Sequence, residues 1–264
     1  MNTAAGLVRH ALMALAVSLA GIAAANAADS YDAAVSHAGR SAADLKRDAL
    51  DHPAGVLRLT GIKSGMRVAD VLAGDGYYSE LLSSIVGPSG HVLMLNNAAF
   101  DHWSIDDLKP RLAGNRLPNV EYRIVDLNQM NLGAATLDAV VLTKVYHDLY
   151  WVDTQGVTKG LWPKIDTSAV LDQLVQALKP GGVLLLIDHS AKAGHGSADA
   201  STLHRIDEAF ARQDFEKRGM QVVASSDLLR RADDPRDQIS YKPPMLGKTD
   251  RFVLVFKKKA KAGK

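Results

Sequence analysis

Residues 68–82 read VADVLAGDGYYSELL, and this stretch decides how the rest of the chain is organised. A short valine-rich run leads into a turn that carries Gly74 and Gly76, after which apolar residues recur at helical spacing. The pattern predicts a strand, a tight loop and a helix. Glycine lets backbone approach a ligand closely, and the first turn of a helix presents free N–H groups. We therefore expect a nucleotide-like ligand here; a glycine turn that serves only the chain path is the alternative.

The order of the acidic residue and the glycines indicates which ligand this loop would bind. A dinucleotide-binding loop reads G-x-G-x-x-G, and its acidic residue closes the second strand. Here Asp70 precedes the glycines, and the second predicted strand ends at Asn96 instead. The loop resembles the D/E-x-G-x-G-x-G motif of class I S-adenosylmethionine-dependent methyltransferases, with Leu72 in the place of the first glycine.

Strand-like and helix-like runs alternate through the rest of the chain, which favours a parallel sheet with helices on both faces. After the first strand, strands are predicted over residues 91–96, 120–125, 137–142, 183–187, 221–224 and 251–256. Helices are predicted over residues 104–112, 167–178 and 202–217. The order predicts an α/β fold with a doubly wound, seven-stranded, mostly parallel sheet.

The resemblance extends beyond the loop. Residues 177–184 read ALKPGGVL and look like the L-K-P-G-G-x-L turn before the fifth strand of class I methyltransferases, and Asp126 matches their acidic residue after the third strand. Residues 145–149, 203–207 and 247–253 resemble a family of exported predicted bacterial methyltransferases. The resemblance implies a Rossmann-like methyltransferase fold, S-adenosylmethionine as cofactor, and methyl transfer to a small acceptor.

The same resemblance implies six cofactor-binding residues: Asp70, Gly74, Gly76, Asn96, Asp126 and Leu127. Asp70 would order the loop and the methionine amino group, while the two glycines admit the ligand to the backbone. Asn96 would bind the ribose hydroxyls as a neutral amide. Asp126 would accept from the adenine amino group with Leu127 beside the ring; a turn or helix cap is the alternative for Asp126.

Three polar residues that follow the fourth predicted strand are the candidate catalytic residues: Tyr146, His147 and Asp148. Ligands of open α/β sheets lie beyond the carboxyl ends of the strands, which brings this segment to the acceptor side. We hypothesise that His147 is the acceptor-facing base or orienting group, because histidine exchanges a proton near neutral pH. Tyr146 would close the pocket and Asp148 would fix the segment; a purely structural histidine is the alternative.

Other histidines and carboxylates recur in the chain without a metal-binding spacing. His189 ends the fifth predicted strand, and His204 and Glu208 are four residues apart on one predicted helix. H-E-x-x-H and comparable spacings do not occur in the sequence, so the spacing predicts no metal site.

The N-terminal 27 residues have the layout of a cleavable signal peptide. Arg9 precedes an apolar run that ends at the small-residue triplet Ala25-Asn26-Ala27. We therefore expect an exported, periplasmic or secreted protein without a stable membrane anchor after cleavage; an uncleaved anchor is the alternative. The expected parts are a signal peptide (1–27), a helical extension (28–60), a methyltransferase-like domain (61–257) and a basic flexible tail (258–264).

The extension and the tail carry further expectations. Ser41 is a predicted N-cap and Pro53 a helix break, and the extension is expected to cap one sheet edge or lean over the cofactor site. The net charge is only +2 and basic residues gather in the tail without interleaved aromatic residues, so we expect no nucleic-acid partner. A small-molecule substrate is what the resemblance to methyltransferases implies. The residues indicate no oligomeric state. The competing hypothesis is an exported non-catalytic binding protein that kept the fold.

Overall fold

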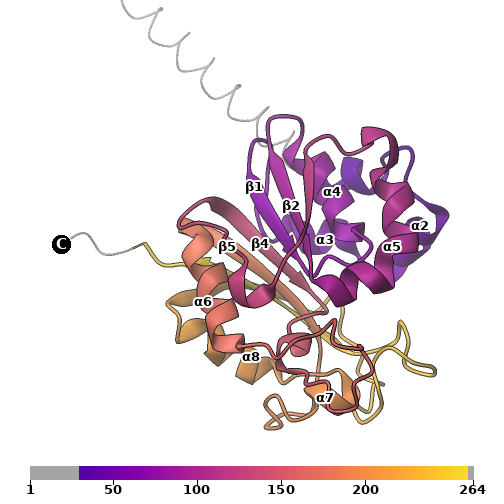
Figure 1. The fold of residues 1–264 in the computed structure, drawn as a ribbon, viewed down its shortest axis with the longest axis vertical. Coiled ribbons are helices and arrows are strands. Elements are labelled where there is room, and N and C mark those ends of the chain that lie inside the picture. Colours follow the sequence, from indigo (N-terminus) through magenta and orange to yellow (C-terminus); the bar gives the residue numbers. More distant parts are fainter. Residues whose placement is uncertain (1–29, 261–264) are drawn as a thin grey trace, which may run out of the picture.

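The structure is a computed structural model that describes residues 30–260 (Figure 1). The predicted signal peptide and the last four residues of the predicted tail lie outside the described residues. Seven strands form one sheet in the order β3-β2-β1-β4-β5-β7-β6. They are β1 (Arg67–Val71), β2 (His91–Asn96), β3 (Val120–Ile124), β4 (Leu137–Thr143), β5 (Leu178–His189), β6 (Met220–Ser226) and β7 (Arg251–Lys258).

The sheet is parallel except at one edge. The first five strands pair in parallel, while β7 runs antiparallel to both β5 and β6. This arrangement confirms the predicted doubly wound, seven-stranded, mostly parallel sheet. The strand order reverses between β1 and β4, which is where ligands bind in open α/β sheets.

Helices cover both faces of the sheet. They are α2 (Ala42–Asp51), α3 (Pro53–Arg58), α4 (Tyr77–Val86), α5 (Ala98–Leu112), α6 (Thr167–Ala177), α7 (Ala200–Leu203) and α8 (Glu208–Glu216), with short 3-10 turns η1 (Ala113–Asn115), η2 (Leu127–Gln129) and η3 (His147–Tyr150). Residues 30–35 are also helical. Within residues 30–260, no helix has both the length and the apolar character needed to cross a membrane.

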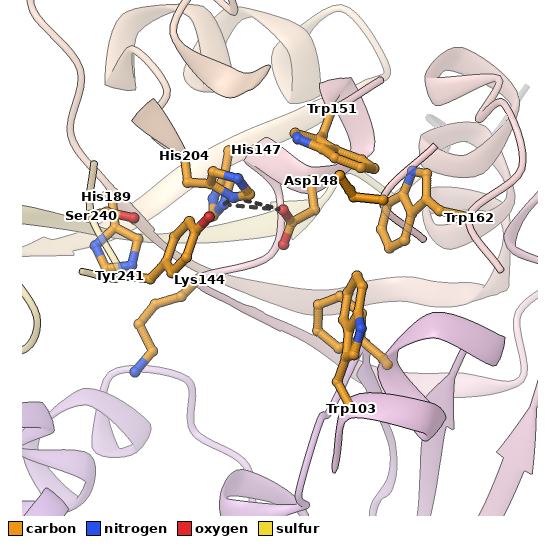
Figure 2. Close-up of a pocket in the computed structure, with 12 residues that line it drawn as sticks. Trp103, Lys144, His147, Asp148, Trp151, Trp162, His189, His204, Ser240 and Tyr241 are labelled. Carbon is orange, nitrogen blue, oxygen red and sulfur yellow. Dashed lines mark hydrogen bonds and ion pairs between the residues drawn. The ribbon is translucent and has the colours of Figure 1, made fainter. Parts of the chain in front are cut away.

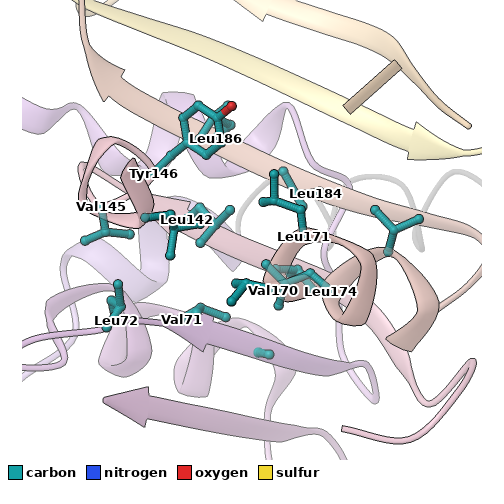
Figure 3. Close-up of a cluster of buried hydrophobic side chains, with 14 of the residues drawn as sticks. Val71, Leu72, Leu142, Val145, Tyr146, Val170, Leu171, Leu174, Leu184 and Leu186 are labelled. Atoms are coloured by element: carbon teal, nitrogen blue, oxygen red, sulfur yellow. The ribbon is translucent and has the colours of Figure 1, made fainter. Parts of the chain in front are cut away.

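Two apolar clusters, one on each face, bury the central strands. Val140 and Leu142 of β4 pack in the cluster beneath α6 (Figure 3), whereas Ala139 and Val141 pack in the cluster beneath α4. Consecutive strand residues point to opposite faces, so β4 is buried on both sides. This double burial explains the unbroken apolar run that the sequence shows there.

The helix predicted over residues 202–217 is wrong as one continuous element. α7 ends at Leu203, α8 begins at Glu208, and His204 between them has a φ of 50°. The backbone N–H of Ile206 donates to the His189 carbonyl at 2.9 Å, so a tertiary contact takes the chain out of the helix. His204 and Glu208 therefore do not share a helix face.

Other boundaries also move. α5 begins at Ala98, six residues earlier than predicted, because the Asn97 side chain accepts from the Phe100 N–H at 2.9 Å and caps the helix there. The predicted Lys-Pro-Gly-Gly turn lies within β5, where pairing with β4 shifts register. β7 continues to Lys258, whose Nζ donates to the carbonyls of Val175 and Leu178, so this residue belongs to the sheet rather than to a tail.

Two details of the N-terminal extension agree with the sequence. The Ser41 hydroxyl accepts from the Asp44 N–H at 3.0 Å, which confirms the predicted N-cap of α2. His52, with a φ of 42°, separates α2 from α3 immediately before Pro53. The described part of the extension is therefore a series of short helices, residues 30–35, α2 and α3, with the break at His52 and Pro53 where it was predicted.

Candidate functional site

The loop after β1 keeps the backbone path of a glycine motif. Leu72, Gly74 and Gly76 all have positive φ, at 53°, 59° and 83°. A left-handed backbone costs a bulky residue about 1–2 kcal/mol, which is why glycine is usual there. Leu72 accepts that conformation while its side chain, 2% exposed, packs in the apolar cluster beneath α6 (Figure 3). The departure from the motif therefore changes the side chain but not the course of the loop.

The two glycines of this loop face different surroundings. A Cβ on Gly76 would lie 2.7 Å from Met94 Cε and 3.0 Å from Arg111 Cδ, so a side chain there would have to displace the end of the Met94 side chain. A Cβ on Gly74 would meet its nearest atom, the Ser104 hydroxyl, only at 3.6 Å. Gly74 is therefore the glycine of this loop at which a Cβ would make only an ordinary van der Waals contact.

Asn96 clamps the loop from the end of β2. Its Oδ1 accepts from the Gly74 N–H and its Nδ2 donates to the Gly74 carbonyl, both at 2.9 Å, and the residue is fully buried. The structure thus turns this amide toward the loop backbone. The predicted contact of Asn96 with the ribose hydroxyls stays a prediction. It requires the side-chain amide to bind the ribose while it also bonds to the backbone of Gly74.

Asp70, at the end of β1, is buried beneath the same loop. One carboxylate oxygen accepts from the Ser79 hydroxyl at 2.7 Å. The other, Oδ1, finds no hydrogen-bond partner among the residues that the structure describes. Burial raises the pKa of Asp70 to about 7, because a desolvated carboxylate is unfavourable.

The helical extension lies over the loop. Arg111 of α5 donates to the Asp75 carbonyl and pairs with Asp44 of α2 at 2.9 Å. Tyr77 donates to Asp48 at 2.6 Å, and the Arg47 guanidinium sits 3.9 Å from the Tyr77 ring centroid. The position of α2 agrees with the expected lean over the cofactor side of the sheet.

A cavity of about 430 Å³, which we call the aromatic cavity, opens beyond the carboxyl ends of β4 and β5 (Figure 2). Its walls come from residues far apart in sequence: Phe100, Trp103, Lys144, His147, Asp148, Trp151, Val157, Trp162, His189, His204, Ser240 and Tyr241. All three tryptophans of the chain line it. The cavity has the size and the mostly apolar walls of a small-molecule site.

His147 is the most constrained polar group in this cavity. Its Nδ1 lies 2.7 Å from Oδ1 of Asp188, whose Oδ2 accepts the His147 backbone N–H at 2.8 Å. Its Nε2 lies 3.2 Å from Asp148 Oδ1 and 3.3 Å from His204 Nδ1. Asp188, at the end of β5, is fully buried, so two strand ends fix the orientation of this imidazole.

The charges of these groups follow from the same contacts. Burial alone would lower the pKa of His147, but attraction to Asp148 and Asp188 outweighs it and raises the pKa to about 10. Burial would raise the pKa of Asp148, yet His147 holds it near 2. An imidazolium donates and does not accept a proton, so the base role of His147 stays a prediction that requires removal of that proton.

Two further groups at the cavity carry shifted pKa values. Burial lowers the pKa of Lys144 to about 8 with help from Arg47, and its Nζ lies 3.0 Å from Asp51 Oδ2. Burial and the neighbouring His147 hold the pKa of His189 well below its usual range, while its Nδ1 lies 2.7 Å from the Thr249 hydroxyl. His189 is therefore a neutral ring already bonded on one side.

The structure separates the three residues that follow β4. His147 and Asp148 line the aromatic cavity, but Tyr146 is fully buried in the apolar cluster (Figure 3) and donates to Asp214 at 2.8 Å. The pocket-closing role that we expected for Tyr146 has no geometric basis. Instead, Trp151, Trp162 and Tyr241 form that wall, and their separation in the sequence left no signal that they meet.

Asp126 and Leu127 line a second cavity of about 360 Å³ beside the start of α5. Asp126 accepts from the Asn128 N–H at 2.9 Å and caps η2, as the structural alternative expected. An adenine contact stays a prediction, since the residue is exposed and borders this cavity. The start of α5 and residues 157–165 contribute to both cavities, so the two lie along one edge of the sheet.

Comparisons with known proteins relate the sequence to methyltransferases at low identity. No family model matches the chain. The "Ubiquinone/menaquinone biosynthesis C-methyltransferase UbiE" of Idiomarina loihiensis is 24% identical over 169 residues, which are 64% of this chain and 58% of the relative. The chain spans about half the length of the curated relatives it matches.

Solved structures show the same fold at low identity. A "SAM dependent methyltransferase from Aquifex aeolicus" has a TM-score of 0.57 at 22% identity, covering 80% of this chain and 92% of the neighbour. The "[4+2]-Cyclase SpnF" has a TM-score of 0.52 at 14% identity, covering 85% of each chain. The chain therefore has the Rossmann-like fold of class I S-adenosylmethionine-dependent methyltransferases.

Proposed function

We propose that this chain transfers the methyl group of S-adenosylmethionine to a small acceptor held in the aromatic cavity. The observation that carries the proposal is the position of that cavity, beyond the carboxyl ends of β4 and β5 in a sheet with methyltransferase strand order. The curated methyltransferase relatives support the same reaction class.

The residues on the donor side fit S-adenosylmethionine. A Cβ on Gly74 would make only one ordinary contact, with Ser104 of α5, and the cavity beside Asp126 and Leu127 lies at the start of the same helix. Two buried polar atoms, Asp70 Oδ1 and Asn97 Nδ2, have no hydrogen-bond partner within residues 30–260, and a polar ligand would supply one. The cofactor would supply an electrophilic methyl group on a sulfonium.

On the acceptor side, the protein would act mainly by placing the acceptor. Its nucleophilic atom would bond to the methyl carbon in line with the carbon–sulfur bond, whose electron pair leaves with sulfur. Such a displacement is accelerated chiefly by alignment and exclusion of water. His147, held by Asp188, would orient a polar group of the acceptor, and the tryptophan walls would keep water out.

The walls also indicate the shape of the acceptor. Trp151 and Trp162 meet edge to face at 5.8 Å between ring centroids, and Phe100 and Tyr241 extend the apolar surface. Aromatic faces bind flat, weakly polar molecules well. We therefore infer a planar, largely apolar acceptor with at least one polar group for the histidines.

Calorimetry with S-adenosylmethionine and S-adenosylhomocysteine tests the proposal. We expect one site per chain for each ligand, followed by methyl transfer to a planar acceptor in a labelled-methyl assay. Cofactor binding without transfer to any acceptor would favour the non-catalytic hypothesis, because one fold can serve more than one function. Absence of binding would overturn the proposal.

Export is a separate part of the proposal. The layout of residues 1–27 supports a cleaved signal peptide and a mature N-terminus at Ala28. Intact-mass or N-terminal analysis of protein from the native host would check it. A full-length cytosolic product would overturn this localisation and leave the methyl-transfer proposal intact.

A further inference from the structure

We propose that His147, Asp148 and His204 bind a divalent first-row transition-metal ion at the wall of the aromatic cavity. One nitrogen of each histidine and one oxygen of the aspartate converge from two segments of the chain (Figure 2). Two imidazoles and one carboxylate form the ligand set of many catalytic zinc and iron sites. The sequence spacing did not predict this site, because His204 lies 57 residues from His147.

The separations between the three ligand atoms match those of a metal site. They are 3.2 Å from His147 Nε2 to Asp148 Oδ1, 3.3 Å from His204 Nδ1 to Asp148 Oδ1, and 3.3 Å between the two nitrogens. A tetrahedral ion about 2.0–2.1 Å from each ligand holds its ligands about 3.3 Å apart. The near-equal triangle therefore needs little movement to accept an ion.

The surroundings of His147 support the assignment independently. Its Nδ1 contacts Asp188 at 2.7 Å, and that carboxylate also accepts the backbone N–H groups of His147 and His189. A carboxylate behind the imidazole keeps the proton on Nδ1, so a metal ion would displace the proton of Nε2 and bind the lone pair of that nitrogen. Because Asp188 is fully buried, the ring cannot rotate away without breaking these bonds.

His204 is also held in place by tertiary contacts. Arg205, the next residue, is fully buried and pairs with Asp234 at 2.8 Å. Ile206 bridges to Ser190 beside β5, and the Tyr241 ring packs edge-on against His204 with centroids 4.7 Å apart. A left-handed φ at a histidine is a strained conformation of the kind that gathers at functional sites.

The charge balance favours a cation. Asp148 would supply a carboxylate ligand to the proposed ion, and Asp188 places a second carboxylate behind the His147 ligand, on its Nδ1. The nearest cavity cation, Lys144, bonds to Asp51 at 3.0 Å and is thereby compensated elsewhere. Three protein ligands leave at least one coordination position on the cavity side, where water or an acceptor oxygen would bind, so His147 would orient the acceptor through the ion.

Metal uptake by the chelator-treated full chain tests the proposal. We expect Zn²⁺ to bind at one equivalent per chain in calorimetry, and Co²⁺ to give the visible bands of a low-symmetry site. His204→Ala should weaken Zn²⁺ binding by at least about 100-fold, because it removes a ligand. Asp188→Asn should weaken Zn²⁺ binding by about 10–100-fold, because Asp188 holds the His147 ligand in place without binding the ion itself. The stoichiometry should remain one Zn²⁺ per chain.

The matched control is His195→Ala. His195 forms an exposed pair with Asp199 at 2.9 Å and does not line the aromatic cavity, so its loss should leave Zn²⁺ affinity unchanged. Absence of Zn²⁺ and Co²⁺ uptake, or equal affinity in wild type and folded His204→Ala, would overturn the metal site. Cofactor calorimetry is a separate measurement, so failure of the metal site is distinguishable from failure of the methyltransferase proposal.

Discussion

The glycine loop after β1 and the aromatic cavity beyond β4 and β5 are built in opposite ways. The loop is one continuous stretch whose polar groups are largely bonded within the protein, as the Asn96 clamp on Gly74 shows. The cavity collects side chains from residues 100–241 and turns several of them toward open space. A continuous motif can therefore specify the path of the backbone. The lining of the aromatic cavity depends instead on which strand ends lie next to each other in the sheet.

Gly74→Val, in the glycine loop, is the substitution from which we expect the largest effect on cofactor binding. A valine side chain would occupy the space that borders the loop, so S-adenosylhomocysteine affinity should fall by more than about 100-fold. Gly114→Val is the control, because Gly114 has a similar φ of 63° and open space around it, so the strain is matched but no ligand is expected nearby. Calorimetry of both folded variants measures their affinity for S-adenosylhomocysteine. Unchanged affinity in Gly74→Val would mean that the ligand binds elsewhere.

His147→Ala tests the cavity instead of the loop. Loss of a positioned catalytic group should lower turnover by about 10²-fold, while S-adenosylhomocysteine affinity stays close to wild type. Steady-state methyl-transfer kinetics with an accepted substrate measure it, with His195→Ala as the surface control. Wild-type turnover in His147→Ala would remove this residue from the mechanism, and lost cofactor affinity would move it to the donor side.

Asp126→Ala tests whether the second cavity, which Asp126 lines, belongs to the cofactor site. If Asp126 binds the adenine amino group, its loss should weaken S-adenosylhomocysteine binding by about 1 kcal/mol, or roughly 5-fold. Asp166→Ala removes a comparable cap, at the start of α6, where the side chain accepts from the Ala169 N–H. Equal affinities for the two variants in calorimetry would mean that Asp126 is only a cap.

The smallest expected effect concerns the pH dependence of stability at Asp70. Its folded-state pKa, about 7, lies above the ordinary value of 3.8, so the carboxyl stabilises the fold at low pH and this contribution is lost as pH rises through 7. Asp70→Asn has no charge to bury. Its Tm relative to wild type should therefore increase by a few degrees between pH 5 and pH 8.

Thermal unfolding followed by circular dichroism at the two pH values measures this effect. Asp106→Asn, an exposed change on α5, is the control and should track wild type at both pH values. If Asp70→Asn also tracks wild type, the buried carboxyl is paired in solution, and the loop has a polar contact that the present geometry lacks.

Local sequence patterns predicted the fold well because they record local physics. Residues 139–142 of β4 form an unbroken apolar run because both faces of the strand are buried there, and α4 begins where Gly76 permits a left-handed turn. The boundaries that were missed depend on distant partners. The helix over residues 202–217 breaks at His204 because Ile206 bonds to His189 and Arg205 to Asp234, and neither contact leaves a trace in helical periodicity.

The strands of the sheet, the glycine turn and the place of His147 after a strand could all be predicted from the sequence. The spacing of apolar residues and glycines is enough to specify these features. Only the tertiary structure decided what surrounds His147. The parallel pairing of β4 with β5 places Asp188 behind it, and the broken helix delivers His204 in front of it. The same turn sends Tyr146 into the core, since neighbouring side chains of a tight turn point in different directions.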